Sequence, residues 1–323
     1  MKKILISMLA VAALVSCSKE ESILVDQGEA IAFGNAFVDN ATRAAVDPSY
    51  SANDIEKFNV YGTVNGVVIY PGTEITKNGA NYGAAWTCPV DQYWIAGANY
   101  KFVGIVDGNK SGVTATTVEN GMPTSISYTA DGKTDLLCQT ITKTAKTDGT
   151  ANGLVAFNFN HLLSKVNFTV NNGSKGASGY SFVVKDIKFN GATAATYNVE
   201  TAAWGSATAN GDTIIGNERT VDSTTVKDIV VASGVENAEL AKEVLFLPGT
   251  YTISFTVDIL YNGTVVTSTN YPATGNTYSH ALAANNAYNF NVGVSVGEKI
   301  QFTVTQQPTW TDGDGVNDTT LTL

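Results

Sequence analysis

The stretch that decides the fold spans residues 155–170 and reads Val155-Ala156-Phe157-Asn158-Phe159-Asn160-His161-Leu162-Leu163-Ser164-Lys165-Val166-Asn167-Phe168-Thr169-Val170. Its second half alternates large apolar residues with polar ones at Val166, Phe168 and Val170. Because successive side chains of a strand point to opposite faces, this period of two predicts a β-strand with one buried face.

Similar apolar segments recur on both sides of this stretch. Downstream, strands are expected at Phe182–Phe189, Val244–Leu247, Ile253–Ile259, Tyr288–Val294 and Ile300–Val304. Upstream, they are expected at Phe58–Tyr61, Val67–Tyr70, Tyr93–Ile95, Tyr100–Val103, Ile126–Tyr128 and Thr134–Cys138. Alternating strands bounded by Gly, Asn and Pro predict an all-β protein built of β-sandwiches. Helices are expected to be scarce, with one or two turns at Asn237–Glu243.

The length of the chain, 323 residues, is enough for two domains. The run from Lys143 to Gly153 has no apolar period, and we place a domain boundary there. This predicts an N-terminal β-sandwich domain at 44–147 and a C-terminal one at 148–310. The aromatic group at Trp86, Tyr93-Trp94 and Tyr100 is expected in the core, with an exposed sugar-stacking patch as the alternative.

The charge pattern argues against nucleic acid as a partner. Charged residues make up 15% of the chain, the net charge is −10, and Lys and Arg total 19 without a basic cluster. Binding to phosphates needs such a cluster. Cys88 and Cys138 either pair, as an oxidising compartment would allow, or remain buried free thiols.

The N-terminus carries an export signal. Lys2 and Lys3 precede an apolar run, Ile4–Leu14, of about eleven residues, too short for the roughly 20 that a membrane-spanning helix needs. We therefore expect a signal peptide at 1–16. Leu14-Val15-Ser16-Cys17 resembles the bacterial lipobox, which implies a lipid attached to Cys17 and an outer-membrane anchor. The residues that follow, Ser18-Lys19-Glu20-Glu21, resemble a surface-export signal.

A propeptide is expected at 17–43. It includes a strand with apolar residues at Ile31 and Phe33, followed by Phe37-Val38. Arg43 lies between small residues, and Arg43–Ala44 therefore offers a site to a trypsin-like or arginine-specific protease.

The tail at 311–323 consists of a Gly/Asp/Asn link and a short strand with Leu321 and Leu323 on one face. A terminal strand beyond a hinge can pair with a neighbouring molecule. Calcium binding at Asp312–Gly315 is set aside, because the EF-hand spacing of acidic ligands is not met.

No catalytic constellation emerges from the sequence. His161 is interpreted as a hydrogen-bonded structural residue, and His280 has no Ser, Asp or Cys partner that the spacing justifies. Phosphate loops, nucleophile elbows and zinc-protease motifs do not occur. The expectation is a protein that is not an enzyme and uses no cofactor or metal.

Phe159-Asn160-His161-Leu162-Leu163-Ser164-Lys165-Val166 resembles a run typical of fimbrillins, the Mfa-like subunits of type V pili. The lipobox, the Ile31-Ala32-Phe33 strand, Thr42-Arg43-Ala44, Tyr61-Gly62 and Trp310 follow in the order usual for that family. The resemblance implies two tandem transthyretin-like β-sandwich domains. It also implies that an arginine-specific protease cuts after Arg43 and that the strand at 31–38 is removed.

The same resemblance implies assembly with other copies of the chain or related pilins. The C-terminal strand of one subunit, here Leu321 and Leu323, would fill the groove of the next, forming a fimbrium on the cell surface. A stalk subunit is the expectation, with a tip or accessory subunit left open by the short tail. The rival interpretation is a monomeric surface lipoprotein or pilus-tip adhesin that binds glycan or a host protein.

Overall fold

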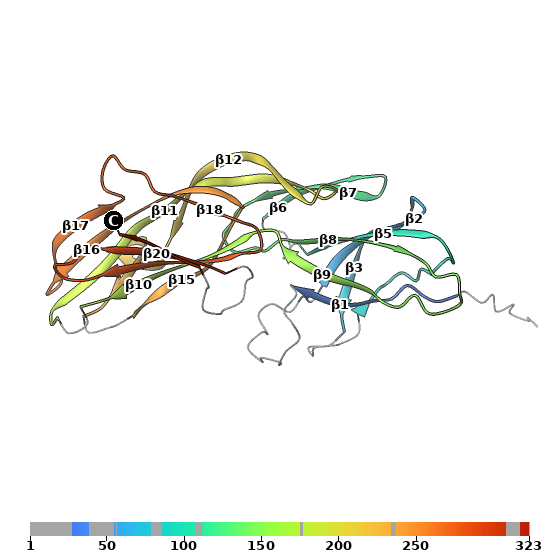
Figure 1. The fold of residues 1–323 in the computed structure, drawn as a ribbon, viewed down its shortest axis with the longest axis horizontal. Helices are drawn as coiled ribbons and strands as arrows, with labels where there is room; N and C mark the ends of the chain where they lie inside the picture. The colour runs from blue at the N-terminus through green and yellow to red at the C-terminus, as the bar shows by residue number, and fades with distance from the viewer. Residues whose placement is uncertain are drawn as a thin grey trace, which may run out of the picture.

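The structure is a computed structural model that describes residues 28–38, 55, 57–78, 86–106, 112–174, 177–233, 237–307 and 317–322, with backbone only for 35–38, 237–243, 307 and 317–322. Every regular element in these ranges is a β-strand. The all-β prediction is confirmed. No helix in the described ranges is long and apolar enough to cross a membrane. Figure 1 shows an elongated molecule with its N-terminal strands at one end and its C-terminal strands at the other.

The N-terminal end is one seven-stranded sheet. In spatial order its strands are β1 (Phe33–Val38), β9 (Val155–His161), β8 (Leu137–Thr144), β5 (Asn99–Val106), β2 (Lys57–Val64), β3 (Val67–Lys77) and β4 (Trp86–Thr87). The β1–β9 pair is parallel, whereas the other neighbours are antiparallel. Because β9 belongs to this sheet, the sheet includes residues on both sides of the boundary expected at 147/148. The division into two tandem domains stays a prediction.

The C-terminal end contains two further sheets. The five-stranded sheet has the order β15 (Asn237–Phe246), β10 (Ser164–Asn172), β19 (Ala287–Val294), β20 (Gln301–Gln307) and β21 (Asn317–Thr322). The nine-stranded sheet contains β13 (Asn217–Val221), β14 (Thr224–Val231), β11 (Tyr180–Asn198), β16 (Gly249–Tyr261) and β17 (Thr264–Tyr271), with β12 (Ala203–Ile215), β18 (Ser279–Leu282), β6 (Val113–Glu119) and β7 (Met122–Thr129) attached.

These two sheets pack face to face as a sandwich. The predicted alternation is confirmed in β10, where Val166, Phe168 and Val170 are fully buried in their shared core. From β10, the Phe168 ring contacts Phe255 of β16, with ring centroids 5.7 Å apart. The apolar side chains at every second position of β10 thus fill the core between the two sheets.

A third cluster of buried residues, the junction core, joins the two ends. It contains Val103, Ile105, Ile126, Tyr128, Leu136, Cys138, Leu162, Leu163, Ala195, Tyr197, Val199, Leu245 and Leu247. Leu162 and Leu163 are the link between β9 and β10, and the Trp204 indole N–H donates a 2.8 Å hydrogen bond to the Leu162 carbonyl. The chain between β5 and β8 of the seven-stranded sheet contains β6 and β7, and β7 pairs with β11 in the nine-stranded sheet, which adds a second connection between the two ends.

The helical turn expected at Asn237–Glu243 is wrong, because this segment is part of β15. Its Glu, Ala and Lys residues favour a helix locally. The backbone instead pairs with β10 over the length of that strand, so tertiary hydrogen bonding overrides local propensity. In the aromatic group, Trp94 and Tyr100 are buried as expected.

Candidate functional site

The N-terminal segment 29–38 is held by backbone hydrogen bonds on two sides. On one side β1 runs parallel to β9, and the Val155 N–H donates to the Ala32 carbonyl at 2.8 Å. On the other side the Ile31 N–H donates to Gln92 at 2.7 Å, and the Trp94 N–H donates to Glu29 at 2.9 Å. The segment therefore lies between the β9 edge and the strand-like residues 92–94, and we call the space it fills the β1 slot.

Two side chains of this segment complete the N-terminal core. Ile31 is 5% exposed and Phe33 is 4% exposed. The Phe33 ring lies 5.4 Å from Tyr70, 6.1 Å from Phe102 and 6.5 Å from Phe157, measured between ring centroids. Aromatic contacts of this kind add to the free energy gained by burial. The β1 slot is thus an apolar groove whose aromatic walls come from β3, β5 and β9.

A polar contact fixes the start of the segment. The Glu29 carboxylate accepts hydrogen bonds from the Asn152 backbone N–H at 2.6 Å, the Asn152 side-chain amide at 2.8 Å and the Gly153 N–H at 3.1 Å. The bond from the Asn152 backbone is the largest influence and lowers the pKa of Glu29, and the Asn152 side chain, Gly153 and the charge of Lys146 act in the same direction. Glu29 is therefore bound as an anion.

Asn152 is itself held in place by two lysine residues. Its side-chain oxygen accepts the Lys146 backbone N–H at 2.7 Å, and its carbonyl accepts the Lys143 ammonium at 3.2 Å. The Lys143 ammonium also donates to the Leu154 carbonyl at 3.0 Å and lies 5.5 Å from the Trp94 ring centroid. The Asn152 side-chain amide and the Gly153 N–H, which shares a peptide group with the Asn152 carbonyl, are consequently oriented by residues outside the β1 segment.

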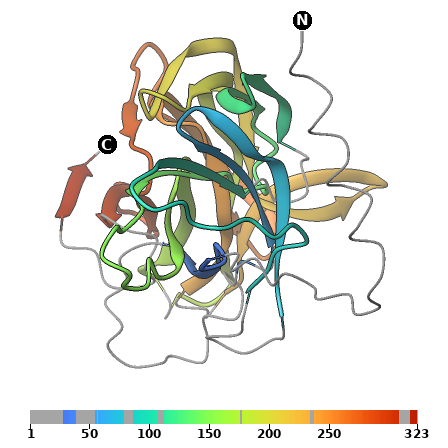
Figure 2. The same ribbon diagram turned by 90° about the vertical axis from the view of Figure 1, so that its right-hand side faces the viewer.

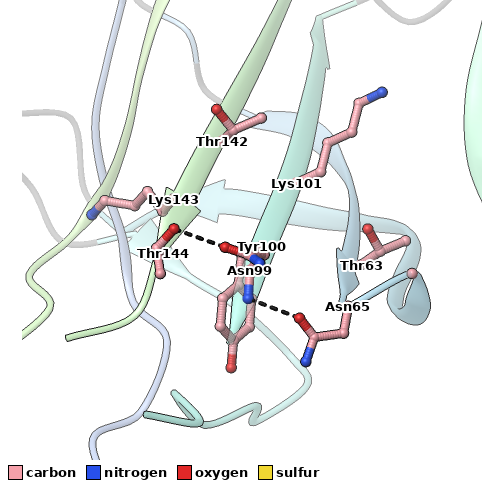
Figure 3. Close-up of a pocket in the computed structure, with 9 residues that line it drawn as sticks. Thr63, Asn65, Asn99, Tyr100, Lys101, Thr142, Lys143 and Thr144 are labelled. Atoms are coloured by element: carbon pink, nitrogen blue, oxygen red, sulfur yellow. Dashed lines mark hydrogen bonds between the residues drawn. The ribbon is translucent and has the colours of Figure 1, made fainter. Parts of the chain in front are cut away.

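A polar depression of about 460 Å³ lies beside this network, at the ends of β2, β5 and β8 (Figure 3). Asn99 connects two of the segments that line it. Its backbone N–H donates to the Asn65 side chain at 2.9 Å, and its side-chain oxygen accepts a hydrogen bond from the Thr144 hydroxyl at 2.8 Å. Lys143 lines the margin and extends away from Lys101 (Figure 3). The depression offers hydroxyl and amide groups, and Lys101 and Lys143 also line it.

Several predicted site residues lie outside the described residues: Cys17, Arg43, Ala44 and Leu323. The backbones of Phe37 and Val38 pair with β9 at Asn158 and Phe159. The Leu321 backbone lies in β21, opposite Phe302 at the edge of the five-stranded sheet. Figure 2 shows β21 (red) at the side of the molecule.

The remaining candidate chemistry is structural. Cys88 and Cys138 are free thiols, packed against the N-terminal core and within the junction core respectively. The buried His161 ring places Nδ1 2.6 Å from the Asp135 carboxylate, as expected of a hydrogen-bonded residue. Among the described residues, no group of three or more His, Cys, Asp or Glu could hold a metal ion.

The sequence did not indicate Glu29, Asn152 or Gly153 as functional residues. Glu29 falls in a polar stretch expected to be a tether, and Asn152 and Gly153 fall in the predicted domain boundary. Their contact joins positions 123 and 124 residues apart, so no local pattern reveals it.

The fold and the slot define a class: β-sandwich proteins in which an N-terminal strand completes a core and a C-terminal strand lies at a sheet edge. The sequence model of the fimbrillin-like family matches residues 42–308. The chain belongs to the fimbrillin-like family. It is accordingly a structural subunit of a cell-surface fimbrium and not an enzyme, and it assembles with other pilin subunits.

One solved structure shares this fold, and a second is similar to it at a lower score. A fimbrial protein from Bacteroides vulgatus has a TM-score of 0.59 and 14% identity, over 88% of this chain and 100% of that protein. A putative cell adhesion protein from Bacteroides uniformis has a TM-score of 0.49 and 17% identity, over 89% and 99% respectively. No curated protein matches the chain.

Proposed function

We propose that the chain is a subunit of a type V pilus that is exported as a lipoprotein on Cys17, cut between Arg43 and Ala44, and polymerised by strand exchange. The observation that carries the proposal is the position of the β1 segment. It precedes Arg43 in the chain, yet it supplies Ile31 and Phe33 to the N-terminal core.

Cleavage after Arg43 would leave β1 attached by non-covalent contacts alone. Its departure would expose the β9 edge and empty the aromatic site of Phe33. An apolar groove beside an unpaired strand edge readily accepts an extended segment, because backbone hydrogen bonds and side-chain pockets are both available. The tail of another copy, with Leu321 and Leu323 on one face, has the required pattern.

A groove at one end and a donor strand from the other half make a head-to-tail contact. Such contacts propagate into a filament, because each added subunit presents the same unfilled partner surface. Before cleavage, the bound β1 segment blocks the groove and prevents premature assembly. The product would be a fimbrium on the cell surface that serves adhesion, released from its outer-membrane anchor.

The distribution of arginine supports a single cut. The sequence contains two arginines, Arg43 and Arg219. Arg219 lies in β13, and its guanidinium binds the buried Asp228 carboxylate through two contacts of 2.5 and 2.6 Å. A protease needs an accessible extended segment and the arginine side chain free to enter its pocket. An arginine-specific protease should therefore cut the folded chain at Arg43.

The test is to treat the purified chain with an arginine-specific endoprotease and run it on an unheated gel. Wild type should lose its N-terminal fragment and form ladders of polymer, whereas Arg43→Ala should remain uncut and monomeric. Arg219→Lys is the matched control, since it also removes one arginine, and it should form ladders like wild type. A single trimmed band without ladders from wild type would overturn strand exchange and favour the monomeric adhesin.

A further inference from the structure

A row of three polar residues crosses the N-terminal sheet inside the polar depression. Thr63 of β2 lies opposite Lys101 of β5, and Lys101 lies opposite Thr142 of β8. Because residues directly opposite each other on neighbouring strands project to the same face, the two hydroxyl groups flank the Lys101 side chain. Figure 3 shows Lys101 between Thr142 and Thr63. Thr63 is only 7% exposed, so its position is fixed by the packing around it.

Lys101 brings a positive charge to the depression that the protein does not neutralise. It forms no ion pair with any residue that the structure describes, whereas Lys57, on the neighbouring strand β2, pairs with Glu74 at 3.2 Å. None of the described residues that line the depression is acidic. The other lysine there, Lys143, extends away from Lys101 and donates to backbone carbonyls (Figure 3). In a chain with a net charge of −10, the depression is therefore a local site for an anion.

The amide groups of the depression are arranged as donors. The Asn65 side-chain oxygen accepts the Asn99 backbone N–H, and the Asn99 side-chain oxygen accepts the Thr144 hydroxyl. An asparagine side chain has one acceptor oxygen and an NH₂ group with two donors. Because the two oxygens are engaged inside the protein, the NH₂ groups remain for a ligand. Together with the Lys101 ammonium they favour a ligand rich in oxygen acceptors.

We propose that this surface, the Lys101 site formed by Thr63, Asn65, Asn99, Lys101 and Thr142, binds an acidic saccharide. The sugar carboxylate would contact the Lys101 ammonium through a charge-assisted hydrogen bond. The sugar hydroxyl and ring oxygens would accept hydrogen bonds from the amide and threonine groups around it.

Size and charge favour this ligand over other anions. The depression of about 460 Å³ accommodates roughly one or two sugar rings. Gly66 lies at its margin, and a Cβ built there meets no atom within 4 Å, so the rest of a longer glycan can leave the site on that side. Nucleic acids and other polyphosphates need several clustered cations, whereas this site presents one ammonium among neutral groups.

The Lys101 site is separate from the β1 slot. Along β5, Tyr100 and Phe102 are buried in the N-terminal core that includes Phe33. Lys101 lies between them in the sequence and projects from the opposite face of the sheet. The inference therefore does not depend on strand exchange, and binding can be measured on the uncut chain.

The test is isothermal titration calorimetry of the uncut chain with sialyllactose and with lactose at low ionic strength. The two sugars share the lactose unit, and only sialyllactose has a carboxylate. Wild type should bind sialyllactose about tenfold more tightly than lactose, the contribution of one charge-assisted hydrogen bond. Lys101→Met and Lys101→Gln should abolish this preference, and Lys101→Arg should keep most of it. Lys133→Met is the matched control, because it removes one charge from an exposed lysine outside the depression and should keep the preference.

Three results would overturn the proposal. Wild type that binds the two sugars equally, or binds neither, would exclude recognition of the carboxylate. A preference for sialyllactose that persists in folded Lys101→Met or Lys101→Gln would place the binding elsewhere, with folding checked by thermal unfolding. Equal losses in Lys101→Met and Lys133→Met would indicate a general effect of charge. A chain that fails to form ladders after cleavage would contradict the proposed function and leave this binding result unchanged.

Discussion

Replacing Phe33 with alanine in the uncut chain should loosen the β1 segment without cleavage. The ring is 4% exposed and contacts Tyr70, Phe102 and Phe157. Removing a buried phenylalanine side chain costs about 3–5 kcal/mol, because the lost burial and the cavity both count. We expect this cost to fall on the equilibrium between bound and released β1, since Phe33 and Ile31 are the large apolar side chains that residues 28–34 bury in the N-terminal core.

The measurement is hydrogen exchange at the Val155 amide, which donates to the Ala32 carbonyl across the β1–β9 pair. A loss of 3 kcal/mol corresponds to more than about a hundredfold faster exchange, since each 1.4 kcal/mol is a factor of ten. Phe33→Leu should give an intermediate rate and would show how well a leucine fills this site. Val67→Ala, at a side chain 66% exposed, is the control and should change stability by no more than about 0.5 kcal/mol.

Exchange at Val155 that is unchanged in Phe33→Ala would refute the reasoning. It would mean that β1 is retained by its backbone pairing alone and that the aromatic site contributes little to holding the occupant of the slot.

Three further results are expected. After cleavage at neutral pH, Glu29→Gln should release the N-terminal fragment faster than wild type, as followed by mass spectrometry of the separated fragment. Because the hydrogen bonds from Asn152 and Gly153 lower the pKa of Glu29 in the folded chain, this advantage of wild type is present above the usual pKa of a glutamate and is lost as the pH falls through the depressed value. Gly62→Ala should destabilise the chain by about 1–3 kcal/mol in urea unfolding, since a Cβ there would lie 2.8 Å from the Tyr70 ring, whereas Gly211→Ala, with its nearest atom at 3.6 Å, is the matched control. Burial raises the pKa of Cys138 to about 12, so iodoacetamide at pH 8 should label it only after unfolding, which peptide mapping would show.

The strands of both ends could be predicted because burial on one face leaves a period of two in the sequence. Val166, Phe168 and Val170 are the clearest example, and their core positions follow directly from the alternation. Ile31 and Phe33 carry the same signal in only three residues, and the sequence therefore located the β1 segment despite its short length.

The polar parts of the slot could not be predicted in this way. Glu29 and Asn152 are 123 residues apart in the sequence and are brought together by the strands between them. A single hydrogen bond of this kind does not produce a periodic pattern of residues that could be recognised in the sequence. The same limit applies to β15, whose local composition favours a helix, and to the pairing of β7 with β11, where Ile126 lies opposite Tyr197. In each case the deciding partner is distant in the sequence.

The pairing of β7 with β11 has a mechanical consequence. Both strands run along the long axis of the molecule (Figure 1), and five residue pairs align them side by side. In the proposed filament, traction enters a subunit at one end and leaves at the other. A force along this axis would load the backbone hydrogen bonds between β7 and β11 all at once, in shear, and would not break them one after another. The Leu162–Leu163 link would then carry less of the force.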